Sequence, residues 1–247
     1  MSAINNIPEK TIERLSEYRR TLLSCHKQGI THIFSHVLAG MHGITAVQVR
    51  RDLMLIGFSS DTKKGYDVKV LIEFINNILD SENPINIAII GMGHLGQAIT
   101  KYFNSKGLKL HIVAAFDVDE QKVGSEIEGI PCYHMEQFED VVSQLDISIV
   151  VISSPTRVAP SLVIPIINAG IKGVLNFTSA PLNFPQGIVS QNFDITTTLE
   201  KVAYFVKEGD ERHLFCSIGF DGNRKGKLII LKKEEGEWKV TAITDRN

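Results

Sequence analysis

The chain has 247 residues, of which 43% are hydrophobic and 22% charged, and its formal net charge is −2. This composition excludes a disordered or collagen-like chain, and the longest apolar runs are far too short for a membrane span. The near-neutral charge does not by itself indicate a nucleic-acid-binding protein, so any DNA contact must depend on local charge. Three widely spaced cysteines and the lack of a secretory signal pattern predict a soluble protein of the reduced cytoplasm.

The first two helices are indicated by their start and stop residues. Pro8 suits a first helical position, because its missing N–H costs nothing there, and Gly29 is a natural end for that helix. Ser35 is a residue type that caps helices, so we expect a short second helix that runs to about Met41.

A third helix is predicted after Gly43. Thr45 and Gln48 have the spacing of a capping box, in which a hydroxyl caps the helix and an amide three residues later completes the pair. We expect this helix to bury its apolar residues Val47, Leu53 and Leu55. A polar loop at 57–65 is then typical of a hairpin or wing, and a fourth amphipathic helix is expected to follow it.

The third helix and the loop after it carry the candidate DNA-binding residues. A capped helix of this kind fits the major groove of B-DNA, and lysines on a wing would enter the minor groove, where negative potential attracts cations. On these grounds we expect DNA contacts from Thr45, Gln48, Arg50, Arg51, Lys63 and Lys64. A solvated basic face is the alternative interpretation of the same charges.

The pattern changes near residues 81–84, where we place a domain boundary. Short apolar runs rich in β-branched residues now alternate with helix-length segments, which favours a parallel sheet covered on both faces. The expected strands are 85–90, 112–116, 147–152 and 173–177. A last amphipathic helix is expected at 196–207, and a small β meander is expected at 215–220, 227–231 and 238–243.

A G-x-G-x-x-G motif lies between a predicted strand and a predicted helix, which is the context that a dinucleotide-binding turn requires. Gly91 would permit the tight turn, Gly93 would let the backbone approach a pyrophosphate, and Gly96 would let the helix pack closely on the strand. Asp117 ends the next strand and suits a carboxylate that accepts hydrogen bonds from a ribose. Its charge would repel a ribose phosphate, so NAD is favoured over NADP. The expected cofactor-binding residues here are Gly91, Met92, Gly93, His94, Leu95, Gly96 and Asp117.

No catalytic residue and no metal ligand is predicted. A dehydrogenase needs a proton donor or acceptor beside its substrate. His94 lies inside the expected phosphate turn, and His111 and His134 have no obvious partner. The sequence contains no Walker loop, nucleophile elbow or metal-ligand spacing. We therefore expect a protein that binds a dinucleotide but does not use it in a catalysed reaction. An NAD-dependent oxidoreductase with a helical N-terminal cap is the alternative.

Three helices, a wing and a dinucleotide motif together resemble the Rex family of redox-sensing transcriptional repressors over residues 7–206. The most specific matching segments are 7–8 with 14–15 and Tyr18, then 46–53, 65–68, 91–96, 114–119, 129–131, 169–173 and 176–177. The resemblance implies an α/β fold with a winged helix-turn-helix at 1–82, a Rossmann-like parallel sheet domain at 83–193 and an exchanged helix at 194–208. A small extra β segment of unknown role would follow at 209–247.

The resemblance also implies a function. A family member is a homodimer that binds palindromic operator DNA when free or bound to NAD and releases it when NADH binds. Its C-terminal helix, here at about 194–205, packs between the two domains of the partner. By position, the polar trio that couples cofactor state to domain orientation is Arg20, Tyr102 and Asp194. The expected cofactor-binding set is completed by Ser154, Pro155 and Asn176.

One segment departs from the family pattern. Its wing usually carries a Thr-Arg-Gly tip, whereas residues 61–64 are Asp-Thr-Lys-Lys, which leaves the operator preference open and favours weaker DNA binding. A third interpretation is therefore a family relative that senses the nucleotide for a protein partner and no longer binds an operator.

Overall fold

The computed structural model describes residues 7–59, 64–104 and 109–207, and three strands at 215–216, 227–234 and 237–245. The chain divides into two compact units, one made of Met1–Asp80 with Asp210–Asn247 and the other of Ser81–Gly209.

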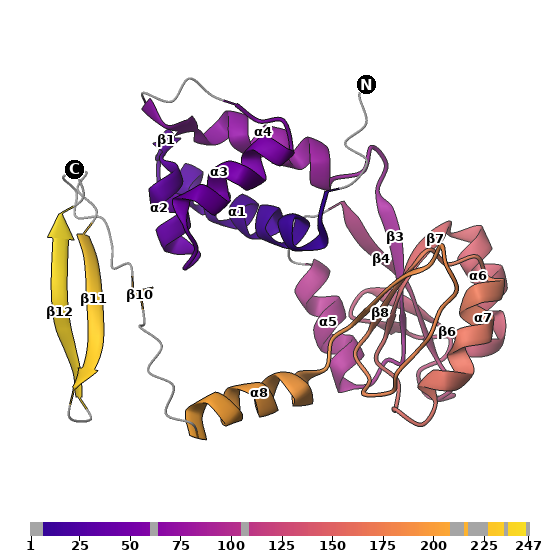
Figure 1. Ribbon diagram of the computed structural model, residues 1–247. Coiled ribbons are helices and arrows are strands. Elements are labelled where there is room, and N and C mark those ends of the chain that lie inside the picture. The colour runs from indigo at the N-terminus through magenta and orange to yellow at the C-terminus, as the bar shows by residue number, and fades with distance from the viewer. Residues whose placement is uncertain are drawn as a thin grey trace. The chain divides into compact units, whose positions relative to one another are not determined.

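The N-terminal part of the first unit is a small helical bundle with a short two-stranded ribbon (Figure 1). In chain order its elements are α1 Glu9–Lys27, β1 His32–Ile33, α2 Ser35–Met41, α3 Ala46–Leu55, β2 Tyr66–Asp67 and α4 Val68–Leu79. Strands β1 and β2 pair antiparallel, so the loop between α3 and β2 returns the chain to the segment that precedes α2. Three helices followed by such a ribbon form a winged helix-turn-helix, as predicted.

The start and end residues of these helices differ in detail from the prediction. Pro8 occupies the N-cap of α1 rather than its first turn, and Gly29 follows the helix with φ 79°. Ser35 does not cap α2, because it is already the first helical residue and the N-cap is Phe34. The Thr45 side chain accepts a hydrogen bond from the Gln48 backbone N–H at 3.1 Å, which is the first half of the predicted capping box.

Of the three apolar residues that α3 was predicted to bury, only Leu53 is buried. Val47 is 57% exposed and Leu55 is also exposed, whereas Val49 and Leu53 lie in the core. Asp52 shares the buried face and is 0% exposed. The prediction for Val47 and Leu55 was wrong because contacts with α1 rotate the helix so that Asp52 faces inward.

The second unit is built on a seven-stranded sheet in the order β5-β6-β4-β3-β7-β8-β9. All neighbours pair parallel except β5 and β6. The strands are β3 Ile85–Ile90, β4 Leu110–Asp117, β5 Glu126–Ile127, β6 Ile130–His134, β7 Ile147–Ile152, β8 Gly173–Asn176 and β9 Val189–Asn192. The four predicted strands are β3, β4, β7 and β8. The sheet has the Rossmann-like arrangement, in which the strand order reverses direction beside β3.

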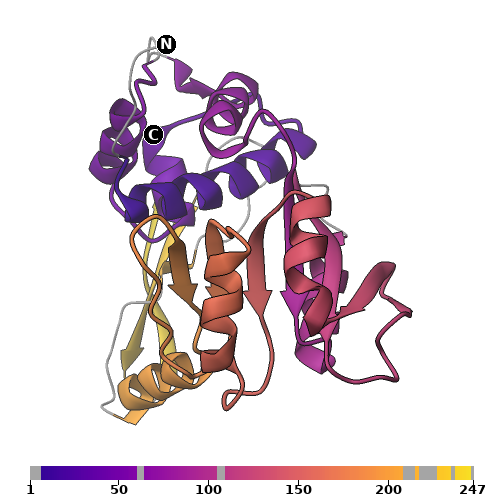
Figure 2. The ribbon, with the colours of Figure 1, turned by 90° about the vertical axis from the view of Figure 1, so that its right-hand side faces the viewer.

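Helices cover the two faces of this sheet unequally. Helices α6 Phe138–Gln144 and α7 Val163–Asn168, with the 3-10 turns Met135–Gln137 and Ala159–Leu162, pack on one face. These two helices lie side by side across the strands in Figure 2. Helix α5 His94–Asn104 packs on the other face through Ile99 and Phe103 (Figure 1).

The prediction that both faces are covered was therefore only half right. Among the described residues, α5 shields the β3–β4 side of its face, and an apolar groove of about 550 Å³ extends from there along β7, β8 and β9. The chain passes from β8 to β9 without a described helix, so this half of the face has no crossover helix over it.

A last helix, α8 Ile195–Lys207, follows β9 and contains no buried residue. Beyond it, β10 Phe215–Cys216, β11 Lys227–Glu234 and β12 Glu237–Asp245 form an antiparallel sheet in that order. The predicted meander thus has three strands, although the turns predicted between them lie outside the described residues.

Candidate functional site

The carboxyl ends of the central parallel strands bring the predicted cofactor residues to one edge of the sheet. Ile90, the last residue of β3, pairs with Phe116 of β4 and with Ile152 of β7, and Ile152 pairs with Asn176 of β8. The segments that follow these residues therefore emerge side by side. In open α/β sheets, ligands bind at this edge where the strand order reverses.

The glycine turn has the geometry that a pyrophosphate needs. Gly91 has φ 96°, and a Cβ added to it would lie 2.7 Å from the Ser154 backbone nitrogen. A Cβ on Gly96 would collide with the Gly91 carbonyl oxygen, so α5 approaches β3 as closely as the backbone allows. A Cβ on Gly93 would meet nothing within 4 Å. Open space thus lies directly before the N-terminus of α5, where free N–H groups and the helix dipole favour an anion.

Asp117 holds the glycine turn from the end of β4. Its Oδ2 accepts hydrogen bonds from the Met92 backbone N–H at 2.9 Å and from Lys122 Nζ at 3.1 Å. Its Oδ1 accepts from the N–H groups of Val118 at 2.8 Å and Asp119 at 3.1 Å. Burial alone would raise the pKa of the Asp117 carboxyl, but these hydrogen bonds outweigh burial and hold the pKa below its ordinary value. The carboxylate is therefore charged at neutral pH.

The three residues between the glycines have different surroundings. The Met92 side chain is fully buried in the core between α5 and the sheet, whereas His94 and Leu95 are exposed at the start of α5. The backbone of Met92 is used in the bond to Asp117. Direct cofactor contacts by these residues stay a prediction.

The segments after β7 and β8 complete the edge. The Ser154 hydroxyl is buried and has no hydrogen-bond partner among the described residues, whereas Pro155 is exposed. A buried hydroxyl without a partner is costly, so Ser154 is suited to bond a ligand.

Asn176 is already engaged at the end of β8. Its Nδ2 donates to the Ala180 carbonyl and to Asn192 Oδ1, and its Oδ1 accepts from both the N–H and the hydroxyl of Thr178. These bonds occupy both polar atoms of the Asn176 side chain and join β8 to β9. A cofactor contact by Asn176 stays a prediction.

The predicted DNA-binding residues surround α3. Thr45, Arg50 and Arg51 are exposed, and Arg50 Nη1 donates to the Ser35 hydroxyl of α2 at 3.1 Å. Gln48 is partly buried, and Lys64 is exposed beside β2. Lys63 lies outside the described residues.

Sequence reasoning missed a buried ionic network that fixes α3 on α1. Arg14 of α1 binds Asp52 through two hydrogen bonds of 2.7 Å, one to each carboxylate oxygen. The Tyr18 hydroxyl donates to Asp52 Oδ2 at 2.8 Å, and Gln48 Nε2 donates to Oδ1 at 2.9 Å. Arg14, Tyr18 and Asp52 all lie in the segments 14–15, 18 and 46–53 that resemble the family pattern, and this was the available signal.

This network shifts the pKa of three of its members, and the hydrogen bond to Asp52 raises that of Arg14. Burial would raise the pKa of Asp52, but the hydrogen bonds from Arg14, Tyr18 and Gln48 outweigh burial and lower it. Burial and the bond to Asp52 raise the pKa of the Tyr18 hydroxyl. The network therefore contains an ionised carboxylate and a neutral phenol over the whole physiological range.

Of the three proposed switch residues, Arg20 belongs to the first unit, and Tyr102 and Asp194 belong to the second. Arg20 is exposed on α1 of the first unit, and Tyr102 is 55% exposed on α5 of the second. Asp194 directly precedes α8 and accepts hydrogen bonds from the Thr196 N–H at 2.9 Å and the Thr197 hydroxyl at 2.7 Å. The Thr197 bond lowers the pKa of the Asp194 carboxyl, which is charged at neutral pH and caps α8.

The fold and the site together define a class of protein, in which a winged helix-turn-helix of the DNA-binding type is joined to a Rossmann-like unit whose glycine turn suits a dinucleotide. Family models agree with both halves. Residues 6–53 match one described as "Putative DNA-binding protein N-terminus", and residues 82–180 match one described as "CoA binding domain". None of the described helices is long and apolar enough to cross a membrane.

Whole-chain relatives identify the family. The chain is 36% identical to the redox-sensing transcriptional repressor Rex of Leuconostoc citreum over 81% of this chain and 93% of that protein. It is 33% identical to the same repressor of Bacillus licheniformis, over 82% of this chain and 94% of that protein. The chain therefore belongs to the Rex family of redox-sensing transcriptional repressors.

Solved structures agree with this assignment. A crystal structure of RSP, a Rex-family repressor, is 28% identical and superposes with a TM-score of 0.74, covering 83% of this chain and 96% of that chain. The structure of RSP in complex with β-NAD+ and operator DNA is 29% identical with a TM-score of 0.77, covering 83% and 95%. A third structure holds RSP with β-NADH.

Proposed function

We propose that this protein is a cytoplasmic, homodimeric transcriptional repressor that binds operator DNA and releases it when NADH binds. It uses the dinucleotide as a signal and is not an enzyme. The observation that carries the proposal is the pairing, in one chain, of a glycine turn open at Gly93 with an α3 helix that exposes Arg50 and Arg51.

The cofactor binds at the carboxyl edge of the sheet in this proposal. Its pyrophosphate occupies the open space before α5, beside Gly93 and the exposed start of the helix. The Ser154 hydroxyl, which is buried and has no partner among the described residues, forms a hydrogen bond with the ligand. Asp117 accepts bonds from the adenosine ribose, for which the Lys122 ammonium has to move aside or share an oxygen. Because Asp117 is charged, NADH is preferred over NADPH.

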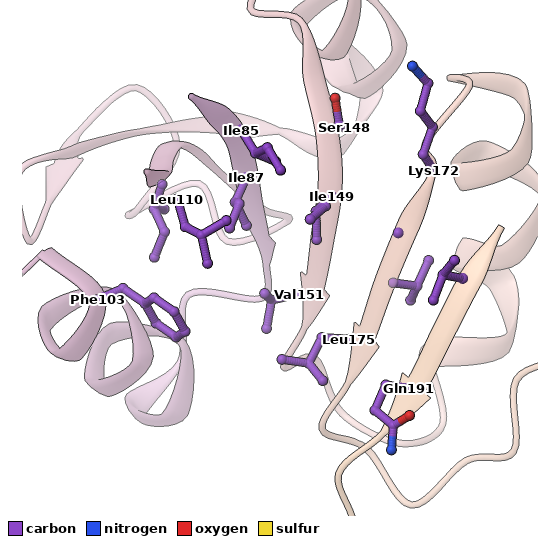
Figure 3. A pocket seen from close by; sticks show the side chains of 14 residues that line it. Ile85, Ile87, Phe103, Leu110, Ser148, Ile149, Val151, Lys172, Leu175 and Gln191 are labelled. Carbon is purple, nitrogen blue, oxygen red and sulfur yellow. The ribbon is translucent and has the colours of Figure 1, made fainter. Parts of the chain in front are cut away.

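Two apolar surfaces that no described residue covers support the homodimer. Helix α8 exposes an apolar stripe that includes Leu199, which is 63% exposed, and Val202. The groove on the open face of the sheet is lined by Ile149, Val151 and Leu175, with Phe103 of α5 at its side (Figure 3). An exposed helix of this kind gains free energy by packing against a second subunit, which is the proposed exchange of residues 194–208.

The proposed switch depends on what Asp194 binds. Its carboxylate caps α8 here, and as a charged acceptor it pairs with either a guanidinium or a phenol. In the proposal, Asp194 exchanges between Arg20 and Tyr102 as NADH changes the arrangement of the two domains.

The test is a titration of labelled palindromic, A·T-flanked operator DNA with the full-length protein, followed by fluorescence anisotropy. We expect tight binding without cofactor or with NAD, and NADH to raise the Kd of the DNA by at least about tenfold. The DNA affinity also falls steeply with salt, because phosphate contacts release counterions.

Three outcomes would refute the proposal. DNA binding that is indifferent to NADH removes the sensing role. Failure to bind any operator, together with NADH binding, indicates a relative that serves a protein partner. Substrate-dependent oxidation of NADH, measured by its absorbance, indicates an oxidoreductase.

A further inference from the structure

The outward face of α3 exposes apolar side chains at its centre, although contacts with DNA phosphates need only polar or charged ones. Val47 and Met54 are separated by two helical turns and are 57% and 70% exposed. Arg51 lies between them on the same face, four residues after Val47, and is also exposed. This face lies opposite the buried side formed by Val49 and Leu53.

The two polar residues that flank this face are held to its sides. Gln48 donates its amide to Asp52, which is itself fixed by Arg14 on α1, so the Gln48 side chain is drawn toward α1. On the other side, Arg50 donates to Ser35 at the start of α2. The side chain at the centre of the first turn of α3 is therefore Val47.

The first turn is the part of a recognition helix that approaches base edges in helix-turn-helix proteins. Among base edges in the major groove, only thymine presents a methyl group, and aliphatic side chains recognise it by contact. An exposed valine has no hydrogen-bonding group that could read any other base.

On these observations, and resting on the proposed function, we propose that Val47 is a specificity-determining residue that contacts the C5-methyl group of a thymine in each operator half-site. Arg51 lies next to it and contacts guanine or phosphate, while Gln48 contributes mainly by bracing α3 through Asp52. The occupant of this face is therefore the major groove of DNA, which the positive charge of Arg50 and Arg51 favours.

The test removes one methyl group at a time from the DNA. A binding site is first selected from a random duplex library with the full-length wild-type protein in the absence of NADH. Each thymine of a half-site is then replaced singly by uracil, which lacks only the methyl group, and the Kd is measured for the wild type and for Val47→Ala. The matched control is Val70→Ala, since Val70 is a similarly exposed valine on α4.

For the wild type, uracil at one position of the half-site weakens binding by about three- to fivefold, the effect expected for one buried methyl group. In Val47→Ala this penalty disappears at that position and penalties elsewhere are unchanged. Val70→Ala keeps the wild-type uracil profile. Circular dichroism melting of Val47→Ala matches the wild type because the side chain is exposed.

Two results would overturn the inference. The first is a uracil profile that is the same in the wild type and in Val47→Ala, which leaves DNA binding intact but removes Val47 from base recognition. The second is that no duplex is enriched by the wild-type protein, which refutes the proposed function itself. The two failures are therefore distinguishable.

Discussion

Replacing Asp52 with asparagine removes one buried negative charge between α1 and α3 and keeps the shape of the side chain. The carboxylate accepts from Arg14, Tyr18 and Gln48 at 2.7–2.9 Å. An asparagine amide can accept on only one side, and its N–H groups would face donors on the other. The Arg14 charge would then be left without its partner.

The size of the effect follows from the burial of the pair. Removing one partner of a buried ion pair costs about 3–5 kcal/mol, because the other charge stays desolvated. The Arg14 side chain is 23% exposed, so water compensates part of the loss and the lower end applies. We expect Asp52→Asn to lower the free energy of unfolding by about 3 kcal/mol. With a urea m-value of about 2 kcal/mol/M, the midpoint falls by about 1.5 M.

The assay is urea unfolding of the full chain by circular dichroism, with hydrogen exchange of α1 and α3 amides to assign the transition to this unit. Glu13→Gln, an exposed change on α1, is the matched control and leaves the midpoint unchanged. Arg14→Met added to Asp52→Asn recovers part of the loss, because it removes the unpaired charge. A loss below 1 kcal/mol in Asp52→Asn would refute the reasoning.

The difference in the free energy of unfolding between the wild type and Asp52→Asn depends on pH. The folded-state pKa of Asp52 is lowered, so its stabilisation is present above the unfolded-state pKa and is lost as pH falls through the folded-state value. The difference in stability between the wild type and Asp52→Asn is therefore constant from pH 8 to about pH 5 and narrows progressively below about pH 4.

Three further predictions concern the cofactor and the dimer. Gly93→Ala keeps the wild-type melting temperature but raises the Kd of NADH, measured by calorimetry, by at least about tenfold. Gly96→Ala lowers the melting temperature, because the added Cβ would collide with the Gly91 carbonyl oxygen. Wild-type NADH affinity in Gly93→Ala would contradict this prediction. Asp117→Asn narrows the preference for NADH over NADPH by about tenfold, or about 1.4 kcal/mol, measured by competition binding, and an unchanged ratio would remove Asp117 from ribose recognition. Leu199→Asp converts the dimer to a monomer in size-exclusion light scattering while Glu200→Gln does not, and an unchanged mass would argue against the exchanged helix.

Local patterns predicted the parts of the fold that depend on neighbouring residues. The run Ile85–Ile90 followed by Gly91 and Asp117 predicted β3, the turn and the end of β4, because strand, glycine and helix are adjacent in the sequence. By contrast, β9 was missed, since Val189–Asn192 is an exposed edge strand with little apolar character.

The orientation of α3 could not be predicted from its own sequence. Its apolar residues fit more than one buried stripe, and the choice depends on Arg14, which lies 38 residues before Asp52. Hydrophobicity alone placed Val47 inside and gave no reason to bury an aspartate. Because Asp52 pairs with Arg14, Asp52 is buried and Val47 is exposed. Val47, which was predicted to lie in the core, is therefore the residue proposed to contact a base.

The proposed function requires that binding of NADH and binding of operator DNA to the same protein change each other's affinity. If NADH weakens DNA binding by a given factor, then operator DNA must weaken NADH binding by the same factor. The most direct measurement is calorimetric titration of NADH into the free protein and into the protein saturated with operator. We expect the Kd for NADH to be at least about tenfold higher for the DNA-bound protein than for the free protein, and equal affinities in the two titrations would contradict this expectation.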